Sequence, residues 1–333
     1  MEFLTNPIPI RQIDLRKALG VAAATMNEIT KKAGLEKHKS KLARNLSPEE
    51  SRLILEHRGI PFPTGEVKVF MTGKGGVGKT TTAYYLATRL SSYGAKVLLI
   101  DSDPSGNLTL AANLDKWGYE LNAQTKILSD VFTGKCSLED TLIKIHSHLH
   151  LVPSTPVNSV LENRIRENYK NPFVPMRIAL EPIKNNYNYI LIDCGPTLNL
   201  INTVMMYAAD HIIMPLNPDI FSRTAIDQTF HEIEIMSRDY PAWKKPKMNI
   251  LFTRFDAREL LSMKYLLEIA EEYEDYILNI TIGASAAFKN AIEKKVNIYD
   301  VKDKNAKKGR DDYDMLAREI IGLKIDPNKI LEN

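Results

Sequence analysis

The decapeptide GKGGVGKTTT at residues 73–82 constrains the fold of this chain more than any other feature of its sequence. It satisfies the pattern G-x-x-x-x-G-K-[ST], follows an apolar run at residues 67–71 and precedes a helical stretch at residues 83–90. A strand, a glycine-rich loop and a helix in this order are typical of a loop that binds the phosphates of ATP or GTP, because backbone N–H groups and the positive end of the helix attract anions. The fold must therefore place the end of a strand beside the start of a helix.

Each position of this loop has an expected contact with a nucleotide. Lys79 is expected to reach the β and γ phosphates, and Thr80 to offer its hydroxyl to Mg²⁺. The other loop residues predicted to bind nucleotide are Gly73, Lys74, Gly75, Gly76, Val77, Gly78 and Thr81. A loop of this kind needs only one lysine, so Lys74 requires a separate explanation.

The length of the chain and one short stretch within it suggest how the domains are divided. A chain of 333 residues is long enough for about two domains. The stretch HRGIPFPTGE carries two prolines and two glycines, which mark a linker. We therefore predict a first domain at residues 1–60, a linker at residues 61–66 and a second domain at residues 67–333, with a separate core in each domain.

The cysteines and the apolar segments indicate the compartment. Cys136 and Cys194 lie far apart, and the stretch MEFLTNPIPIRQID at the N-terminus lacks the features of a signal peptide. Two such cysteines are expected to be buried as small apolar side chains rather than to form a disulfide or a zinc site. No segment reaches the ~18 uninterrupted apolar residues of a membrane span. We expect a cytoplasmic protein that has no membrane partner.

Apolar runs alternate with helical patterns along the second domain. The runs lie at residues 67–71, 96–101, 149–153, 189–195, 211–215 and 248–253. Continuous Val, Ile and Leu runs separated by helices indicate an α/β fold, with a doubly wound and mainly parallel sheet of the P-loop NTPase kind. Phosphate ligands should gather at the carboxyl ends of its strands. The charged stretch at residues 300–312 is expected to be a loop, with a final helix at residues 313–322.

Aspartates stand at the ends of two of these runs. Asp101 ends the run LLID, Asp103 follows two residues later, and Asp193 ends the run YILID. Each aspartate alone could be a helix cap or a turn residue. Both follow apolar strands in a chain with a phosphate-binding loop, and the apolar run before Asp193 suits a carboxylate that holds Mg²⁺ beside the Thr80 hydroxyl.

The segments KGGVGKTTT, DSDPSGN and LIDCGPT resemble the deviant Walker A motif, the following aspartate motif and the Walker B motif of the ParA/MinD ATPases. The resemblance extends from residue 67 to about residue 320 and is strongest to ParA proteins with a DNA-binding N-terminal extension. It implies a slow ATPase, stimulated by a ParB-like centromere-binding partner, that partitions plasmids or chromosomes. It also implies ATP or ADP and Mg²⁺ as cofactors, a homodimer with ATP, and association with the nucleoid. One departure is Ser105, where the family usually has glutamine.

The same resemblance implies roles for individual residues. Lys74 is similar to the signature lysine of the family, which reaches across an ATP-bound dimer to the phosphates held by the partner. Asp101 and Asp193 would organise the Mg²⁺ shell. Asp103 would position the attacking water, so Lys74, Lys79 and Asp103 are the expected catalytic residues. Pro218 and Thr253 mark the regions expected to contact the nucleotide base.

The N-terminal segment has the pattern of a small all-α helix-turn-helix domain, and it resembles the winged helix-turn-helix found in long ParA proteins. The stretch IDLRKALGVAAATMNEITKKAGL predicts helices at residues 14–19 and 22–32, with a shared apolar seam formed by Leu15, Leu19, Val21, Met26 and Ile29. The residues expected to face a DNA groove from the second helix are Thr25, Asn27, Lys31 and Lys32. Nine basic and three acidic residues between positions 10 and 46, with Lys37, Lys39 and Lys41 among the basic ones, favour an anionic partner. A basic helical hairpin used for packing or dimerisation is the alternative.

Two further segments belong to these hypotheses. The stretch SPEESRLILEHRGI begins with a helix start signal, and Leu53, Ile54 and Ile60 could pack its helix on the first two. Near the C-terminus, residues 281–300 resemble the family segment that contacts DNA nonspecifically. Its lysines are Lys289, Lys294 and Lys295, which would either touch phosphates or lie on a solvated helix face.

Other functions share the loop motif but fit the sequence less well. A MinD-like positioning ATPase would need a basic amphipathic helix at the C-terminus, and this C-terminus is short of basic residues. Iron–sulfur reductases with this loop need paired cysteines, and a bacterial tyrosine kinase needs a tyrosine-rich tail. A transcriptional repressor whose ATPase fold acts as a nucleotide-controlled switch stays compatible with the partition role.

Overall fold

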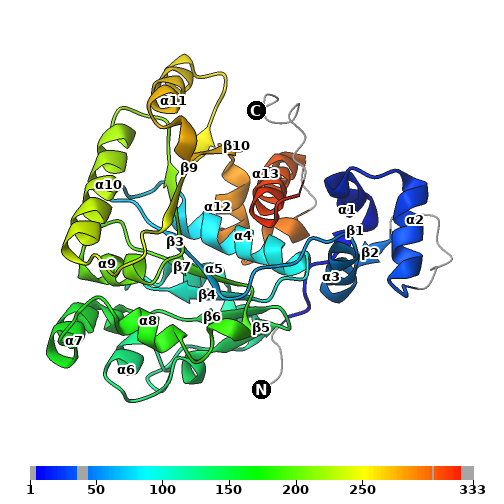
Figure 1. Cartoon of the computed structure of the whole chain (residues 1–333). Helices are drawn as coiled ribbons and strands as arrows, with labels where there is room; N and C mark the ends of the chain where they lie inside the picture. The colour runs from blue at the N-terminus through cyan, green and yellow to red at the C-terminus, as the bar shows by residue number, and fades with distance from the viewer. Residues whose placement is uncertain (1–4, 36–43, 302–303, 324–333) are drawn as a thin grey trace.

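A twisted β-sheet organises the second part of the chain. In the computed structural model the described residues are 5–35, 44–301 and 304–323. Among them, eight strands form one sheet in the order β10-β9-β8-β3-β7-β4-β6-β5 (Figure 1). In chain order the strands are β3 (Glu66–Phe70), β4 (Val97–Asp101), β5 (Ile143–His146), β6 (Leu149–Val152), β7 (Tyr189–Asp193), β8 (His211–Leu216), β9 (Lys247–Phe255) and β10 (Ile277–Gly283).

The pairing of the strands confirms the predicted fold class. Neighbouring strands run parallel from β10 to β6, and only the edge strand β5 is antiparallel to its neighbour β6. Six of the strands occupy the predicted apolar runs, whereas β5 and β10 are additional. Each parallel connection carries a helix across a face of the sheet, as a doubly wound fold requires.

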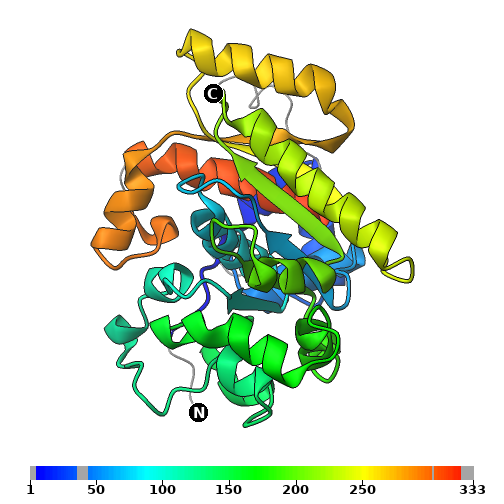
Figure 2. The ribbon, with the colours of Figure 1, turned by 90° about the vertical axis from the view of Figure 1, so that its left-hand side faces the viewer.

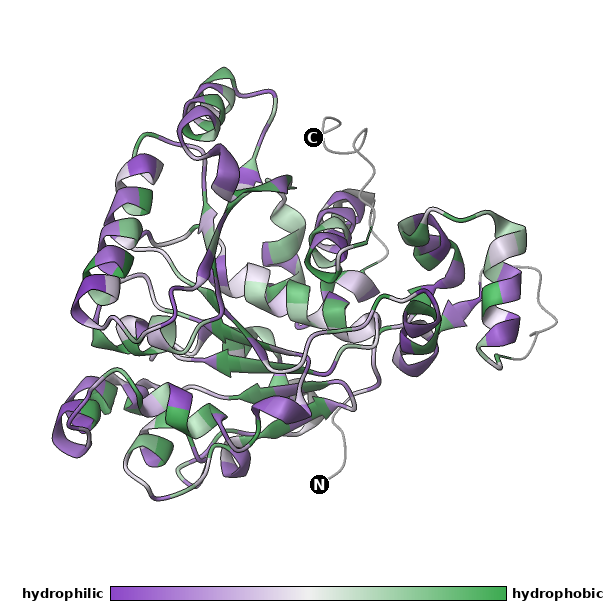
Figure 3. Ribbon diagram, viewed as in Figure 1, coloured by the Kyte–Doolittle hydropathy of each residue, from purple (hydrophilic) through white to green (hydrophobic). Residues whose placement is uncertain are grey.

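Helices cover both faces of the sheet (Figures 1 and 2). One face packs against α4 (Lys79–Ser92), α5 (Asn107–Ala111), α12 (Ala286–Glu293) and α13 (Lys304–Ile321). The other face packs against α6 (Leu128–Phe132), α7 (Leu161–Asn168), α8 (Pro175–Leu180), α9 (Leu200–Tyr207), α10 (Ser222–Asp239) and α11 (Leu260–Glu272). In β4, Val97 and Leu99 enter the first core, and Leu98 and Ile100 enter the second. This two-sided burial explains the apolar strands in Figure 3.

The expectation of a loop at residues 300–312 is wrong. Helix α13 begins at Lys304 and continues to Ile321, and Ala306, Tyr313 and Leu316 on it are buried. Gly309 within this helix is needed for packing, because a Cβ atom there would lie 2.5 Å from Cζ of Phe288. Lys307 and Lys308 of the charged run lie on the solvent side of this amphipathic helix, whereas Asp312 is buried and accepts from the backbone N–H of Gly283 at 2.9 Å.

One cysteine and one leucine are less buried than expected. Cys194 is buried as expected, but Cys136 is only half-buried. In the N-terminal part, Ile54 is buried and Ile60 is partly buried, whereas Leu53 is 44% exposed and Leu55 is buried in its place.

Within residues 5–35 and 44–65, the N-terminal part shows three helices and a short strand pair. The helices are α1 (Gln12–Leu19), α2 (Ala23–Lys32) and α3 (Pro48–His57). Strands β1 (Ile10–Arg11) and β2 (Asn45–Leu46) pair antiparallel, so this part is not purely helical as expected. The predicted seam is present, with Leu15, Leu19, Met26 and Ile29 buried and Val21 packed against them. Lys37, Lys39 and Lys41 lie outside the described residues.

The N-terminal helices pack directly on the larger part of the molecule. Their core side chains belong to one continuous cluster with Tyr85 of α4, Tyr93 directly after it, and Leu316 of α13. Phe62, within the predicted linker, is buried with its ring edge on Tyr189 at a centroid distance of 6.4 Å. Figure 1 shows α1 and α3 beside α13 and the end of α4. The expectation of a separate core in each domain is therefore wrong.

A buried ionic cluster joins α4 to α13. Asp314 accepts from Arg89 Nε at 2.5 Å and from Tyr93 Oη at 2.8 Å, and its second oxygen lies 2.5 Å from Arg318 Nη2. Burial alone would raise the pKa of Asp314, but the Arg89 and Arg318 guanidiniums outweigh it and hold the pKa below its usual value.

The substitution Asp314→Asn is expected to destabilise the fold by about 3–5 kcal/mol, because it leaves two buried guanidiniums without a carboxylate. A lowered pKa in the folded state means that Asp314 stabilises the fold above the unfolded pKa of about 3.9, and that this contribution is lost as the pH falls through the folded value. Urea unfolding of both proteins near neutral pH and below about pH 4 checks this, since the difference should shrink in acid. Glu274→Gln, at an exposed carboxylate, is the control. A difference that stays constant with pH would contradict the assignment.

Candidate functional site

The loop between β3 and α4 closes around its second lysine. Lys79 is the first residue of α4, and its Nζ donates to the carbonyl oxygens of Lys74 at 2.8 Å and Thr72 at 3.3 Å. Burial lowers the pKa of Lys79, although Asp193 opposes this effect. Val77 is buried under the loop, while Gly75 and Gly76 are exposed and Gly73, Gly78 and Thr81 are partly exposed. The start of α4 and the Lys79 ammonium therefore lie in the loop that follows the carboxyl end of β3, where a triphosphate would lie.

Thr80 and Asp193 form the second part of the site. The Thr80 hydroxyl donates to Oδ2 of Asp193 at 2.6 Å. Oδ1 of Asp193 is buried and has no hydrogen-bond partner among the described residues. Burial, together with Asp101, raises the pKa of Asp193 well above its usual value. A hydroxyl beside a carboxylate with an unsatisfied oxygen fits Mg²⁺, which prefers oxygen ligands and keeps several waters.

Asp101 lies next to Asp193, and both of its carboxylate oxygens accept hydrogen bonds from neighbouring residues. The two aspartates are paired across the register of β4 and β7. Oδ1 of Asp101 accepts from the Asp103 backbone at 3.2 Å, and its Oδ2 accepts from the backbone and hydroxyl of Thr109 at 2.8 and 2.7 Å. Burial raises the pKa of Asp101 to about 7 despite these bonds. In this geometry Asp101 holds the loop that carries Asp103, and its contact with Mg²⁺ stays a prediction.

Asp103 lies between the ends of two neighbouring strands. It is 8% exposed, and its Oδ1 accepts from the backbone N–H of Ser105 at 2.9 Å. Gly195, after β7, is so close that a Cβ atom there would lie 3.5 Å from Cγ of Asp103. The loops after β4 and β7 thus bring Asp103 near Asp193, where a carboxylate could orient a water molecule.

Lys74 has a partner within its own chain. Its ammonium forms an ion pair with the carboxylate of Asp219 and lies 5.9 Å from the centre of the Phe221 ring. Phe221 is 69% exposed, so this corner of the site faces solvent. Asp219 follows Pro218 in the loop after β8, and sequence reasoning missed its role because the pair is separated by 145 positions.

Thr253 connects the loop to the sheet. Its hydroxyl donates to the Val77 carbonyl at 2.6 Å and also lies 3.3 Å from the Leu216 carbonyl. This buried side chain supports the phosphate-binding loop from β9. The nucleotide-base contacts of Thr253 and Pro218 stay predictions.

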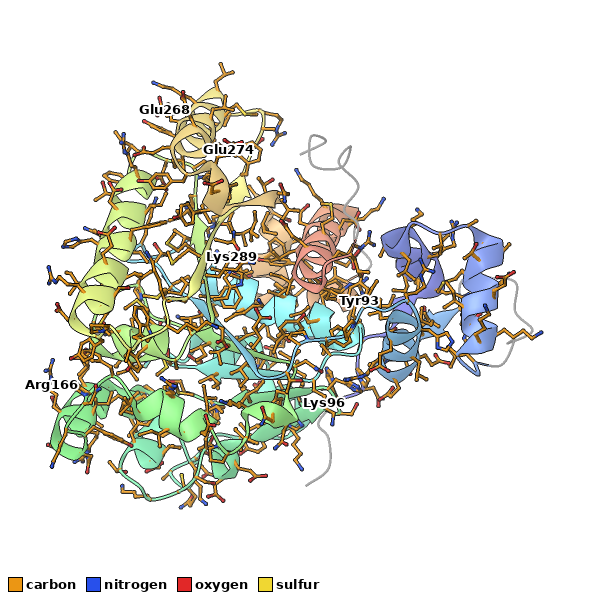
Figure 4. All side chains as sticks on the ribbon, viewed as in Figure 1. Tyr93, Lys96, Arg166, Glu268, Glu274 and Lys289 are labelled. Carbon is orange, nitrogen blue, oxygen red and sulfur yellow. The ribbon has the colours of Figure 1, made fainter. Side chains whose placement is uncertain are left out.

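The residues expected to contact DNA form two separate groups. On α2, Asn27, Lys31 and Lys32 are exposed and Thr25 is half-buried. On and after α12, Lys289 lies 3.8 Å from Glu293, Lys295 pairs with Asp115, and Lys294 is exposed. Figure 4 shows Lys289 well away from the N-terminal helices. Two of the three lysines near α12 thus have carboxylate neighbours, as on a solvated helix face.

Known proteins with similar sequences include P-loop domains and partition proteins. A family model described as an AAA domain matches residues 65–250, so the match begins one residue before β3. The chain is 31% identical over 261 residues to the chromosome partitioning protein ParA of Caulobacter vibrioides, covering 76% of this chain and 92% of that protein.

Solved structures share the fold. The ATP complex of a variant of Cyanothece McdA has a TM-score of 0.68 at 21% identity, covering 79% of this chain and 99% of that one. Cobyrinic acid a,c-diamide synthase from Mycobacterium smegmatis, with a bound ATP analogue and magnesium, has a TM-score of 0.61 at 24% identity, covering 76% and 95%. Within residues 5–35, 44–301 and 304–323, no helix is long and apolar enough to cross a membrane.

Proposed function

The chain belongs to the ParA/MinD-type P-loop ATPases, and from this we infer that it is an ATP-dependent DNA partition protein. The observation that carries this proposal is the joint placement of Lys79, Thr80 and Asp193 at one edge of the sheet, in a chain 31% identical to a chromosome partitioning protein. In the proposal, ATP drives homodimerisation and nonspecific DNA binding on the nucleoid in the cytoplasm. A ParB-like partner stimulates slow hydrolysis.

Hydrolysis would be in-line attack of water on the γ phosphate. Lys79 would exchange its two carbonyl partners for the β and γ phosphates of the bound nucleotide. Thr80 and Asp193 would hold Mg²⁺, which neutralises phosphate charge when bound. Asp103 would orient the water, and Asp101 would hold the Asp103 loop in place. Lys74 would leave Asp219 to reach the phosphates of a second protomer.

The first 60 residues are proposed to form a DNA-binding domain, followed by a linker at residues 61–66 and the ATPase domain at residues 67–333. Exposed Asn27, Lys31 and Lys32 on α2, which follows α1 after a turn at Gly20, support a recognition helix. Binding of this domain to an operator would let the protein regulate its own operon. The decisive experiment measures DNA binding with ATP, with ADP and without nucleotide, on random DNA and on the gene's own upstream region. No DNA binding in any of these states would overturn the proposal.

The substitutions Lys31→Gln and Lys32→Gln should each weaken DNA binding. Each should also lower the magnitude of the slope of log affinity against log salt by about 1, because a protein with one phosphate contact fewer displaces fewer counterions when it binds. Fluorescence anisotropy over a range of salt concentrations measures the slope. Lys264→Gln, at an exposed lysine of α11, is the matched control and should leave the slope unchanged. Unchanged slopes for the α2 variants would favour the packing role of this hairpin.

A further inference from the structure

A cavity of about 190 Å³ lies at the amino ends of β4 and β6, away from the nucleotide site. These two strands are parallel, and the nucleotide site lies beyond their carboxyl ends. The five residues of β4, at about 3.3 Å each, separate the cavity from that site by about 16 Å. The residues that line the cavity include none of the phosphate-binding loop at positions 73–82. The cavity is therefore separate from the site that the proposed function uses.

Strand pairing gathers two lysines and two histidines around this cavity. Lys144 of β5 stands opposite His150 of β6, and His150 stands beside Leu98 of β4. Side chains alternate along a strand, so Lys96 shares the face of Leu98, two residues later. His148 shares the face of His150 for the same reason. Both lysines and both histidines line the cavity, and Figure 4 shows Lys96 at this end of the sheet.

The two lysines carry charge that is not balanced. Lys96 and Lys144 are exposed, and neither ammonium forms an ion pair within the part of the chain that the structure describes. Glu139 also lines the cavity and is exposed. Two ammoniums against this one carboxylate leave the described lining with a net positive charge near pH 7.

The two histidines form part of a more buried floor. Nδ1 of His150 lies 2.7 Å from Oη of the buried Tyr187. Nδ1 of His148, which is also buried, lies 2.9 Å from Ser147 Oγ and 3.5 Å from a carboxylate oxygen of Glu49. Nε2 of each ring has no hydrogen-bond partner among the described residues. Each imidazole is therefore held through one nitrogen and keeps the other for a ligand.

The pKa values of both histidines reflect this environment. Burial, followed by Lys144 and Lys96, lowers the pKa of His150 to about 4. Burial also lowers the pKa of His148, although Glu49 opposes this effect. A bound anion would relieve the repulsion among these groups, whereas a cation would add to it. In agreement, the described residues contain no group of three or more His, Cys, Asp or Glu side chains that could hold a metal ion.

We propose that this cavity binds a small ligand that carries a phosphate group, held between the ammoniums of Lys96 and Lys144. Lysine binds phosphate as a point charge, and the free imidazole nitrogens would add hydrogen bonds. The cavity is smaller than the about 300–1,000 Å³ of sites for drug-sized ligands, so the ligand is small. Leu142 and Ile183 also line it and would contact an organic part, while Glu139 would accept from a hydroxyl group.

The test titrates the full chain with inorganic phosphate and with glycerol 3-phosphate, using calorimetry. ADP and Mg²⁺ are present throughout so that the phosphate-binding loop is occupied. Both probes should bind, and glycerol 3-phosphate should bind more tightly if the natural ligand is a phosphate ester rather than free phosphate. In NMR spectra, the ring-proton signals of His148 and His150 should shift on binding, whereas those of the exposed His231 on α10 should not.

Charge variants locate the bound phosphate. Lys96→Gln and Lys144→Gln should each weaken binding of both probes by about 10-fold or more, the effect of losing a charged hydrogen bond. Both lysines are exposed, so these variants should fold normally. Lys170→Gln, at an exposed lysine outside the cavity, is the matched control. Glu139→Gln should instead tighten binding of inorganic phosphate by up to about 5-fold, because it removes a like charge.

Three results would overturn the proposal. They are no binding of either probe, unchanged affinity in both Lys96→Gln and Lys144→Gln, and binding that leaves the signals of His148 and His150 in place. None of them affects the proposed function, because the cavity shares no residue with the phosphate-binding loop. Conversely, a protein that fails to bind ADP would contradict the proposed function, while the lysine variants would still decide whether phosphate binds in this cavity.

Discussion

Replacing Asp103 with alanine is expected to abolish ATP turnover while leaving ATP bound. The carboxylate lies near the Mg²⁺ candidate Asp193 but contacts none of the loop groups expected to hold phosphate. Removing it should therefore spare binding and lower turnover by about 10²- to 10⁴-fold, the range for loss of a group that assists proton transfer or orients the nucleophile. Phosphate release measures turnover, and a fluorescent ATP analogue measures binding. With hydrolysis blocked, the variant should accumulate as the ATP-bound dimer.

Asp103→Asn separates charge from shape. Its amide oxygen can still accept from the Ser105 backbone, so the loop after β4 should keep its conformation. If this variant is as inactive as Asp103→Ala, the negative charge itself is required to orient the water. Normal turnover in Asp103→Ala would remove Asp103 from the mechanism.

The central strands could be predicted because burial on both faces leaves a continuous apolar run. The edge strands could not, since each has only one neighbour and carries exposed polar residues. Lys144 in β5 and Asn279 in β10 are exposed, and they interrupt the apolar pattern. The start of α13 could not be predicted for a related reason. A run of charged residues that contains a glycine is typical of a loop, and the reason for a glycine inside this helix is a tertiary contact: Phe288 occupies the space that a side chain at position 309 would need.

The local part of the site could also be read from the sequence. Lys79, Thr80 and Asp193 lie in short motifs whose chemistry is set by neighbours along the chain, and the structure brings them together. Contacts between distant segments could not be predicted in this way. Asp219 reaches Lys74, Thr253 supports Val77, and Pro48 meets Gly94 only because the sheet order places their loops side by side. Such pairs leave no periodic signal in a single sequence.

The two loop lysines should give different defects when each is replaced by alanine. Lys79 is buried inside its own loop, so Lys79→Ala should weaken nucleotide binding by the monomer about 10- to 100-fold, equivalent to losing a charged hydrogen bond of about 1.5–3 kcal/mol. Lys74 points away from the loop toward Asp219. Lys74→Ala should keep ATP binding within a few-fold of normal but abolish ATP-dependent dimerisation, cooperative DNA binding and hydrolysis. Titration with a fluorescent ATP analogue and light scattering with ATP and Mg²⁺ measure both effects.

The physical reason lies in the charge between two protomers. Two triphosphates buried at one interface repel each other strongly where the dielectric constant is low, and a lysine donated by each protomer would offset that repulsion. Asp219→Asn is the control, because it removes the partner that Lys74 has within its own chain but keeps the ammonium. That variant should still dimerise with ATP, and its dimer should form at the same or lower ATP concentration, since Lys74 no longer leaves an ion pair to cross the interface. A Lys74→Ala protein that dimerises normally with ATP would show that this lysine serves only the loop of its own protomer.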